Sequence, residues 1–533
     1  MLDRGLVLPH LLDQCAATSP DAVAMVDVEG RSVTFAELQR TYRTWAGACK
    51  RLGVQPGEPV LTMLPNSFES YFAWLGVAWL RAIEVPTNNM YRGDMLRYLV
   101  DNSTARFLII SQRYFDRLAD VIGDLPGVEA VVVPDAGRGD LPDLGVPVLG
   151  DLDFLHGVEP ADDEPGPEPF DTCAMIYTSG TTGPSKGVLV PWAELWQFVN
   201  LPPEGMIPEG GAYYTMYPAF HVSGKSSLYL SARYRARLVI RESFSLEHFW
   251  SDIREHGVQA AGLVGPLAAL LMLNPPQPDD ADTPLEKVFM GPLVPQLDEF
   301  KARFGVDVGT GFGMTEIGAP LGSDGFDLAN ATSCGRLRDG PPHYEVRVVD
   351  EHDELLPPGA VGELVVRAGE PWVLNAGYWR MPEKTAEAWR NGWFHTGDAF
   401  RYDDEGNYYF VDRLKDAIRR RGENVSSFEV EALVVQHPQV QECAAVGVAS
   451  ELGEEEIKVV VVAAAGEELD PKELIEFLIP RMPRFMIPRF VEVADALPKT
   501  DATFRTRKFQ LREDPLNHRT WDREAAGVAL PKE

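Results

Sequence analysis

The sequence predicts an α/β protein built from a large multi-layer N-terminal domain, in which β-sheets are flanked by helices, and a small α+β C-terminal domain. Three observations support this fold class. Helical periodicity alternates with short apolar runs from the first residues onward. The length of 533 residues exceeds what one hydrophobic core usually supports. The residue composition of the sequence also changes near Asp412, where a charged segment begins.

The N-terminal elements follow from these patterns. Amphipathic spacing predicts helices over 35–52 and 68–82, and an apolar run predicts a strand over 59–64. Residues 159–170, EPADDEPGPEPF, are acidic and rich in proline. We therefore expect them to form an exposed connector between two layers of the larger domain.

The C-terminal part has its own alternation of helix and strand. Residues 428–437 and 471–478 are predicted to be helical, and 444–448 and 458–463 to be strands. A C-terminal domain of about 120 residues fits this stretch.

A glycine-rich segment, YTSGTTGPSKG at 177–187, follows the apolar residues 173–176, which are typical of a buried strand. Its glycines allow close backbone approach to a ligand, its hydroxyls add donors, and Lys186 adds positive charge. The segment therefore predicts binding of a triphosphate. The Walker loop is excluded because Pro184 and Ser185 precede the lysine, where that loop requires a glycine. A solvated linker is the alternative that composition alone allows.

Composition limits the other classes of function. The chain has 49 basic and 80 acidic residues and a formal charge of −31, which opposes general binding to nucleic acid or to an anionic membrane surface. Five cysteines without a CxxC pair, and an N-terminal segment without the features of a signal peptide, lead us to expect a reducing cytoplasm. No apolar run approaches the roughly 20 residues of a membrane-spanning helix. The sequence carries no signal for an oligomeric state.

With four further motifs, the chain resembles the adenylate-forming superfamily of acyl-CoA synthetases, luciferases and adenylation domains. The resemblance extends nearly from end to end and is greatest to bacterial ligases of the fatty-acid and carnitine-CoA type. It implies an N-terminal adenylation domain over 1–414, with the ATP and carboxylate sites, and a mobile C-terminal domain over 415–533, joined by a hinge. The motifs are GFGMTE (311–316), GWFHTGD (392–398), DRLKDAIRRRGENV (412–425) and LPKT (497–500).

The resemblance assigns roles around ATP. The loop at 178–186 would wrap the β- and γ-phosphates, and Phe312 stands in the usual tyrosine position beside adenine. Glu316 is the expected Mg²⁺ ligand, because a hard dication prefers oxygen donors. Asp398 would accept both ribose hydroxyls, with Arg413 near the ribose or the α-phosphate. The expected nucleotide-binding residues are Thr178, Ser179, Gly180, Thr181, Thr182, Gly183, Gly291, Pro292, Gly311, Phe312, Gly313, Met314, Thr315, Asp398, Arg413, Lys415 and Gly422.

The remaining roles concern the hinge and the acid. Lys415 lies where the family has its hinge, and Gly422 would border the pantetheine tunnel after the small domain swings. His221 lies in YPAFHVSG, where many relatives have an aromatic-His pair beside the carboxylate pocket. The candidate pocket walls are Tyr217, Phe220, Val222, Ser223, Gly224, Met290 and Gly309.

The C-terminal tail departs from the family pattern. Relatives usually close with LPKTxxGK, whose lysine reaches the forming acyl-adenylate, whereas this chain has LPKTDATFRTRKFQLRE. Anchoring on 509–513 places Phe504 at the glycine and Arg505 at the catalytic lysine, and Lys508 could replace it after a local shift. Arginine keeps the charge but presents a planar fork, so the replacement is not conservative.

The leading hypothesis is a ligase that activates a small-molecule carboxylic acid with ATP and Mg²⁺ and then passes the acyl group to coenzyme A. Lys186, Mg²⁺ on Glu316, and Arg505 or Lys508 would offset developing charge, while His221 would orient the carboxylate. Two alternatives stay open. The acceptor could instead be an amine, a carrier protein, or nitrite with an aryl amine. The chain could also be a nucleotide-binding protein without catalysis.

Overall fold

The computed structural model describes residues 2–136, 141–178, 184–294, 296–413, 417–420, 423–450, 453–498, 506 and 508–530. The chain divides into two compact units, and each is described by itself. Unit 1 comprises Met1–Asn89, Val100–Tyr177 and Gly187–Asp412. Unit 2 comprises Met90–Leu99, Thr178–Lys186 and Arg413–Glu533.

The first sheet has the strand order β7-β6-β5-β3-β4-β8-β9, and its pairs from β7 to β8 are parallel. Strands β3, β4, β5 and β6 are buried along their whole length. Parallel strands covered on both faces form such continuous apolar runs. The strands are β3 (Pro59–Met63), β4 (Ile83–Pro86), β5 (Phe107–Ile110), β6 (Ala130–Val133), β7 (Val148–Gly150), β8 (Thr172–Thr178) and β9 (Lys186–Pro191).

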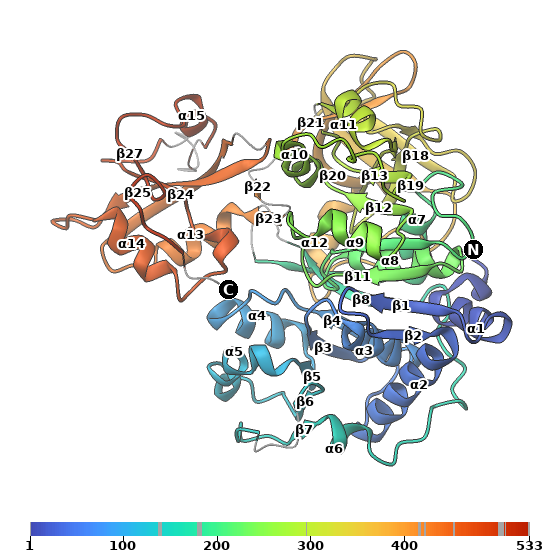
Figure 1. The fold of residues 1–533 in the computed structure, drawn as a ribbon. Helices are drawn as coiled ribbons and strands as arrows, with labels where there is room; N and C mark the ends of the chain where they lie inside the picture. The colour runs from blue at the N-terminus through green and yellow to red at the C-terminus, as the bar shows by residue number, and fades with distance from the viewer. Residues whose placement is uncertain are drawn as a thin grey trace. The chain divides into compact units, whose positions relative to one another are not determined.

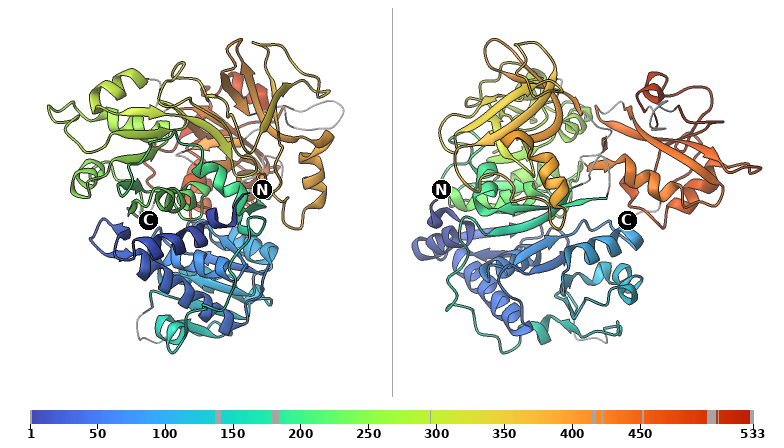
Figure 2. Two further views of the ribbon diagram at one scale, coloured as in Figure 1. Left: turned by 90° about the vertical axis from the view of Figure 1, so that its right-hand side faces the viewer. Right: turned by 180° about the vertical axis from the view of Figure 1, so that it is seen from behind.

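The second sheet has the order β14-β13-β12-β10-β11-β1-β2, with β2 the only antiparallel strand among the described pairs. It stacks over the first sheet, with helices between and around them (Figures 1 and 2). The indoles of Trp74 and Trp192 stack in the shared core, with ring centroids 5.4 Å apart. The strands are β1 (Val23–Asp27), β2 (Ser32–Thr34), β10 (Ala212–Thr215), β11 (Arg237–Ile240), β12 (Ala260–Leu263), β13 (Lys287–Met290) and β14 (Asp307–Gly309).

The helices of these layers show how well local signals place element ends. Helix α2 (Phe35–Leu52) has the predicted bounds, because Thr34 and Glu37 form a capping box and Gly53 ends the helix at φ 97°. Helix α3 (Phe68–Trp79) ends earlier than predicted, since Arg81 takes a φ of 59° and β4 begins at Ile83. The others are α1 (Leu8–Thr18), α4 (Gly93–Ser103), α5 (Phe115–Ala119), α6 (Asp151–Leu155), α7 (Trp192–Val199), α8 (Val222–Arg233), α9 (Phe249–Glu255), α10 (Gly265–Leu273) and α11 (Leu297–Phe304).

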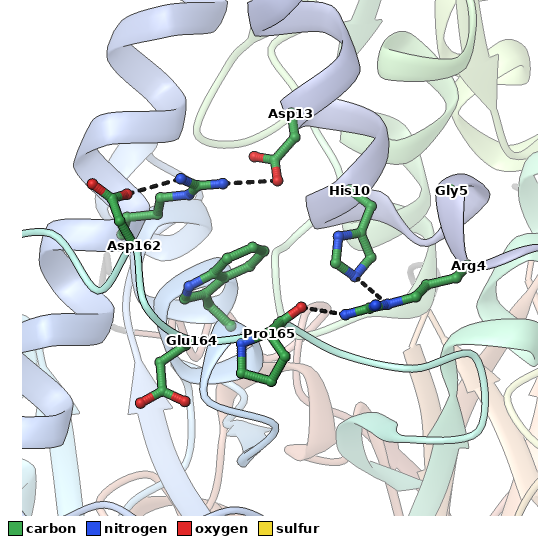
Figure 3. A pocket seen from close by; sticks show the side chains of 9 residues that line it. Arg4, Gly5, His10, Asp13, Asp162, Glu164 and Pro165 are labelled. Carbon is green, nitrogen blue, oxygen red and sulfur yellow. Dashed lines mark hydrogen bonds and ion pairs between the residues drawn. The ribbon is translucent and has the colours of Figure 1, made fainter.

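The acidic segment 159–170 is bound to α1 and α2 rather than exposed as a free connector. Arg43 of α2 donates to Asp162 of the segment and to Asp13 of α1, each at 2.8 Å. Trp79 donates its indole N–H to the Ala161 carbonyl at 2.8 Å. These contacts border a cavity of about 370 Å³ (Figure 3). The expectation of an exposed connector is therefore wrong in part, because basic residues neutralise its carboxylates and several of its residues are buried.

Two smaller antiparallel sheets complete unit 1. One has the order β15-β16-β17 and the other β18-β19-β20-β21. They share a core in which Phe312 of β15 packs edge-on against Phe400 of β20. The elements are β15 (Gly311–Met314), β16 (Gly318–Gly322), β17 (Arg336–Leu337), β18 (Tyr344–Val349), β19 (Gly362–Ala368), α12 (Pro382–Ala388), β20 (Phe394–Tyr402) and β21 (Tyr408–Arg413).

Unit 2 has a four-stranded sheet, β24-β25-β26-β27, and a two-stranded sheet, β22-β23. The predicted helix at 471–478 has the predicted bounds, and the other predicted elements are present with shifted ends. The fold class is thus confirmed: a large domain of sheets flanked by helices and a smaller C-terminal domain. Over the described residues, no helix combines the length and apolar character needed to cross a membrane. The elements are β22 (Ala417–Arg420), β23 (Glu423–Ser426), α13 (Ser427–Val434), β24 (Val440–Ala449), β25 (Glu455–Ala463), α14 (Pro471–Leu478), β26 (Phe490–Val493), α15 (Lys508–Glu513) and β27 (Thr520–Asp522).

Candidate functional site

Several predicted site residues of unit 1 lie in loops at one edge of the second sheet. The loops that follow β10, β12, β13 and β14 all leave the carboxyl ends of parallel strands. These loops lead to His221, Gly265, Gly291 and Gly311 respectively. In open parallel sheets, ligands bind outside the carboxyl ends of the strands. Three predicted site residues, His221, Gly291 and Gly311, therefore lie at the edge of the sheet where this topology favours ligand binding.

Two loops that carry predicted nucleotide-binding residues, one at Gly291 and one at Gly311, are direct neighbours. Thr310 donates its hydroxyl to the Met290 carbonyl at 2.7 Å, which joins the ends of β14 and β13. A Cβ atom on Gly291 would lie 3.2 Å from the Gly311 carbonyl oxygen. Glycine therefore allows the two loops to approach this closely. The peptide bond between Gly291 and Pro292 is cis.

Residues Gly311 to Thr315 form β15 and the turn after it, and Phe312 and Met314 pack against the core of the two small sheets. The ring centroids of Phe312 and Phe400 lie 4.8 Å apart at 69°. A Cβ atom on Gly313 would lie 2.5 Å from the Gly318 carbonyl oxygen, so only glycine fits at this position. The stacking of Phe312 on adenine stays a prediction.

Glu316 follows β15 directly and is 7% exposed. Its backbone carbonyl accepts hydrogen bonds from Asn375, from the backbone N–H at 3.1 Å and from the side-chain amide at 2.6 Å. Burial, and then the nearby Glu316 carboxylate, raise the pKa of the Tyr378 hydroxyl. The segment that carries Asn375 and Tyr378 also bonds to Gly187 and Leu189 of β9, the strand after the glycine-rich loop. The backbone of Glu316 is therefore bound to a segment that itself pairs with β9.

A second carboxylate, Glu194 of α7, was not found by sequence reasoning. It is fully buried, and among the described residues neither of its oxygens has a hydrogen-bond partner. Burial raises the pKa of Glu194 well above its usual value, and the Glu316 carboxylate raises it further. The Gly318 N–H lies near Glu194 without the geometry of a hydrogen bond. An acidic residue in the largely apolar segment PWAELWQFV was the signal available in the sequence.

The negative environment around Glu194 and Glu316 fits a divalent cation. Mg²⁺ binds through one or two protein carboxylates together with phosphate oxygens. Glu194 and Glu316 both raise the pKa of Tyr378, so the three groups share one electrostatic environment. The chemistry of these side chains is therefore compatible with the predicted role of Glu316 as a metal ligand, which remains a prediction.

Asp398, the predicted ribose ligand, lies in β20 and is 4% exposed. Its backbone N–H donates to the Thr396 hydroxyl at 3.1 Å. Asp398 lies two residues before Phe400 in the same strand, and the Phe400 ring contacts Phe312. The structure thereby connects the strand of the predicted ribose ligand to the strand of the predicted adenine wall.

His221 is the residue before the first turn of α8, and its ring centroid lies 5.0 Å from that of Phe220. The Tyr71 hydroxyl donates to the Gly224 carbonyl at 3.1 Å, which anchors the start of the helix. The predicted wall residue Tyr217 lies near Gly262, where an added Cβ would be 3.2 Å from its ring. The structure places His221 and these wall candidates together after β10, while their contact with an acid stays a prediction.

The other predicted residues belong to unit 2. Thr178 ends β8 and Lys186 begins β9. Ser185, between them, donates its backbone N–H to Glu429 at 3.1 Å. The backbone of Arg413 ends β21. The predictions for Ser179, Gly180, Thr181, Thr182, Gly183, Lys415, Gly422 and Arg505 fall outside the described residues.

Lys508, the alternative catalytic cation, begins α15 within unit 2. Its ammonium donates to the Ser427 hydroxyl at 2.7 Å and forms an ion pair with Glu431 at 2.6 Å. Its side chain is 15% exposed. These contacts connect α15 to α13. That either Arg505 or Lys508 takes the place of the family's catalytic lysine stays a prediction.

Comparison with known proteins supports the adenylate-forming family. Residues 12–379 match the model of the AMP-binding enzymes, and residues 429–503 match that of the AMP-binding enzyme C-terminal domain. A crotonobetaine/carnitine-CoA ligase of Citrobacter koseri is 29% identical, over 93% of this chain and 97% of the relative.

Solved structures have the same fold. A double mutant of o-succinylbenzoate CoA synthetase from Bacillus subtilis has a TM-score of 0.80 at 22% identity, over 94% of this chain and 98% of the other. The amide bond synthetase McbA from Marinactinospora thermotolerans has a TM-score of 0.77 at 24% identity, over 94% and 99%. The chain therefore belongs to the AMP-binding enzyme family and is an adenylate-forming enzyme of the acyl-CoA synthetase-like type.

Proposed function

We propose that this enzyme activates a small-molecule carboxylic acid with ATP and passes the acyl group to coenzyme A. A substrate carboxylate oxygen attacks the α-phosphorus of ATP, the bond to the bridging oxygen breaks, and pyrophosphate leaves. The thiol sulfur of coenzyme A then attacks the acyl carbon of the acyl-adenylate, AMP leaves, and the thiol proton is released. The relative of Citrobacter koseri, whose name specifies a CoA ligase, supports this acceptor.

The buried carboxylate Glu316 beside Glu194 is the observation that carries the proposal. When bound there, Mg²⁺ would neutralise charge on the phosphate oxygens. Two hydrogen bonds from Asn375 hold the backbone of Glu316 in place, so this ligand would need little reorganisation when nucleotide binds. Lys186 and either Arg505 or Lys508 would add positive charge, and His221 would orient the substrate carboxylate. The C-terminal domain would turn about Lys415 between the two half-reactions.

The test of the metal ligand is Glu316→Ala. We expect pyrophosphate release to fall by roughly 100-fold or more, because a preorganised contact to developing charge is lost. Glu299→Ala is the matched control, since Glu299 is exposed on α11 and should leave the rate unchanged. Undiminished release by the Glu316 variant would show that this carboxylate does not hold the metal.

The acceptor is tested separately. Pyrophosphate release is measured with a panel of fatty, aromatic and betaine-like acids, each with and without coenzyme A, and product thioester is detected directly. Turnover that requires both the acid and coenzyme A supports the proposal. Release that is indifferent to coenzyme A contradicts it.

A different acceptor is the second candidate, motivated by the altered tail at Phe504 and Arg505 and by the fold shared with an amide bond synthetase. Replacing coenzyme A by hydroxylamine, a carrier protein, or an aryl amine with nitrite would identify it. Nucleotide binding without pyrophosphate exchange under any acid would instead indicate a protein that has lost catalysis.

A further inference from the structure

The strand that carries Asp398 is interrupted at the site by a bulge. Across β19 and β20, Glu363 pairs with Ala399 and Val365 pairs with His395. Between these pairs, Leu364 of β19 faces three residues of β20, Thr396, Gly397 and Asp398, which we call the TGD bulge. Extra residues in one strand bend it and redirect its side chains, and such bulges are frequent beside active sites. The direction in which Asp398 points thus depends on how the TGD bulge is held.

Side chains supply the hydrogen bonds that the interrupted ladder cannot. Glu363 accepts the Gly397 N–H through Oε1 at 2.9 Å, and its Oε2 bonds to Nδ1 of His395 at 2.9 Å. Thr396 donates its hydroxyl to the Leu364 carbonyl at 2.6 Å and accepts the Asp398 N–H at 3.1 Å. Gly397 has a φ of 72°, which favours glycine. The Glu363 side chain therefore contacts the middle of the TGD bulge at Gly397 and the residue just before the bulge at His395.

Glu363 is itself held firmly. Its carboxylate forms an ion pair with Arg390 at 3.0 Å, and its side chain is 13% exposed. The side chain of His395 is 3% exposed, and its Nε2 lies 3.8 Å from Asp353. A carboxylate that accepts charge-assisted and backbone bonds in a partly buried setting has one preferred orientation. The contacts around Glu363 thus give the TGD bulge a fixed anchor.

We propose that Glu363 is a positioning residue for the nucleotide ribose: it holds the TGD bulge so that the Asp398 carboxylate receives both ribose hydroxyls. This inference rests on the proposed function, in which Asp398 binds the ribose of ATP. Glu363 acts through the bulge and has no assigned contact with the nucleotide. Its loss should therefore weaken recognition of the ribose hydroxyls selectively, while recognition of the other parts of ATP persists.

The test is equilibrium binding of ATP, 2′-deoxy-ATP and 3′-deoxy-ATP with excess MgCl₂, measured by calorimetry on the full-length protein. Wild-type protein should bind each deoxynucleotide roughly 10- to 100-fold more weakly than ATP, because each lacks a hydrogen bond to a charged acceptor. Glu363→Ala should bind ATP about as weakly as the deoxynucleotides, so the ratio of dissociation constants falls toward one. A merely structural loss would lower all three affinities together and leave the ratio unchanged.

Matched variants make the result decisive. Glu363→Gln keeps the shape and one acceptor oxygen, so it should give an intermediate ratio, and it decides the question should Glu363→Ala not fold. Glu345→Gln is the control, since Glu345 lies in β18 of the same sheet and forms an exposed pair with Arg367 at 2.7 Å. It should retain the wild-type ratio. Wild-type ratios in both Glu363 variants would overturn the inference.

Asp398→Ala separates this inference from the proposed function. A ratio near one in Asp398→Ala and in Glu363→Ala supports both. A ratio near one in Asp398→Ala with wild-type ratios in the Glu363 variants overturns only the positioning role. Wild-type discrimination in Asp398→Ala would show that Asp398 does not bind the ribose, and the role of Glu363 would fail with it.

Discussion

Two buried carboxylates in the same unit lie in opposite electrostatic environments. Glu84 of β4 forms an ion pair with Lys225 of α8 and accepts a hydrogen bond from Thr62 at 2.8 Å, and both members of the pair have side chains only 2% exposed. Glu194 of α7 is equally buried, yet no described residue hydrogen-bonds to its oxygens, and the charge that acts on it is that of Glu316. We call the environment of Glu84 compensated, because a counterion and a hydrogen bond offset its burial, and that of Glu194 uncompensated.

The difference separates structure from function. A buried charge is tolerated when it is paired and hydrogen-bonded, so the Lys225 pair needs nothing from outside the protein. An acidic group buried without hydrogen-bond partners opposes folding, and proteins retain such groups mainly at functional sites. The uncompensated environment contains the predicted metal ligand Glu316, whereas the compensated pair lies in the core between β4 and α8. Four measurements test this difference between the environments of Glu84 and Glu194.

The largest effect is expected at the compensated pair. Lys225→Met should lower the free energy of unfolding by about 3–5 kcal/mol, because Glu84 would be left buried without a counterion. Adding Glu84→Gln should recover a large part of the loss, since the stranded charge is removed. Unfolding in urea measures both values.

Lys287→Met is the matched control for this change. Lys287 also pairs with a carboxylate, Asp307 at 2.6 Å, and its ammonium lies 4.6 Å from the centre of the Phe326 ring. The Lys225 ammonium lies 4.3 Å from the centre of the Trp74 ring. The Lys287 pair is more exposed, so its loss should cost about 1 kcal/mol or less. Equal losses at the two lysines would show that burial does not distinguish the pairs.

The next effect concerns the cation that the uncompensated environment would accept. ATP with Mg²⁺ at about 100 times its dissociation constant should stabilise the wild-type protein by roughly 2.7 kcal/mol. Glu316→Gln should lose most of the part that depends on Mg²⁺. Thermal unfolding with nucleotide, with and without EDTA, measures this part. A gain that is insensitive to EDTA in the wild-type protein would contradict a cation at these carboxylates.

Glu194→Gln should stabilise the nucleotide-free protein by about 1–2 kcal/mol, because it removes a buried acidic group that lacks partners. Its raised pKa means that the folded protein keeps a proton that the unfolded chain releases, so stability falls as pH rises above the unfolded value of 4.5. The glutamine has no such loss, and the gain should be larger at about pH 8 than at about pH 5. Unfolding in urea at the two pH values tests this, and a gain independent of pH would refute the electrostatic explanation.

Local signals predicted much of the fold. The capping box at Thr34 and the glycine at 53 set the two ends of α2. Asp470 caps α14 by accepting the Lys472 N–H, which sets the start of that helix. The helix predicted over 68–82 was too long because the φ of Arg81 is set by the turn into β4, which periodicity does not encode. The segment 159–170 was predicted to be exposed because its composition is polar, whereas its contacts with Arg43 and Trp79 come from distant parts of the chain.

The site divides in the same way. The motifs GFGMTE and GWFHTGD predicted Glu316 and Asp398 as site residues, because the residue types and the order of these motifs are specific to the family. Glu194, Tyr378 and Glu363 were missed, because their importance comes from contacts made only after folding. His395 lay inside the quoted motif GWFHTGD, but its bond to Glu363 depends on the register of β19 and β20. Spacing in the sequence does not define that register across a bulge.

The smallest effect is expected at Glu363, where the dependence of stability on pH should be opposite to that at Glu194. Glu363 is a compensated carboxylate, and its hydrogen bonds with His395 and the Gly397 N–H hold its pKa below its usual range. A lowered pKa contributes stability that is present above the unfolded value of 4.5 and is lost as pH falls through the folded value. Glu363→Gln should therefore cost about 1 kcal/mol at neutral pH, and the cost should shrink as the solution is acidified. Urea unfolding between about pH 7 and pH 4 follows this difference. A cost that grows in acid would place Glu363 with Glu194, among the uncompensated carboxylates.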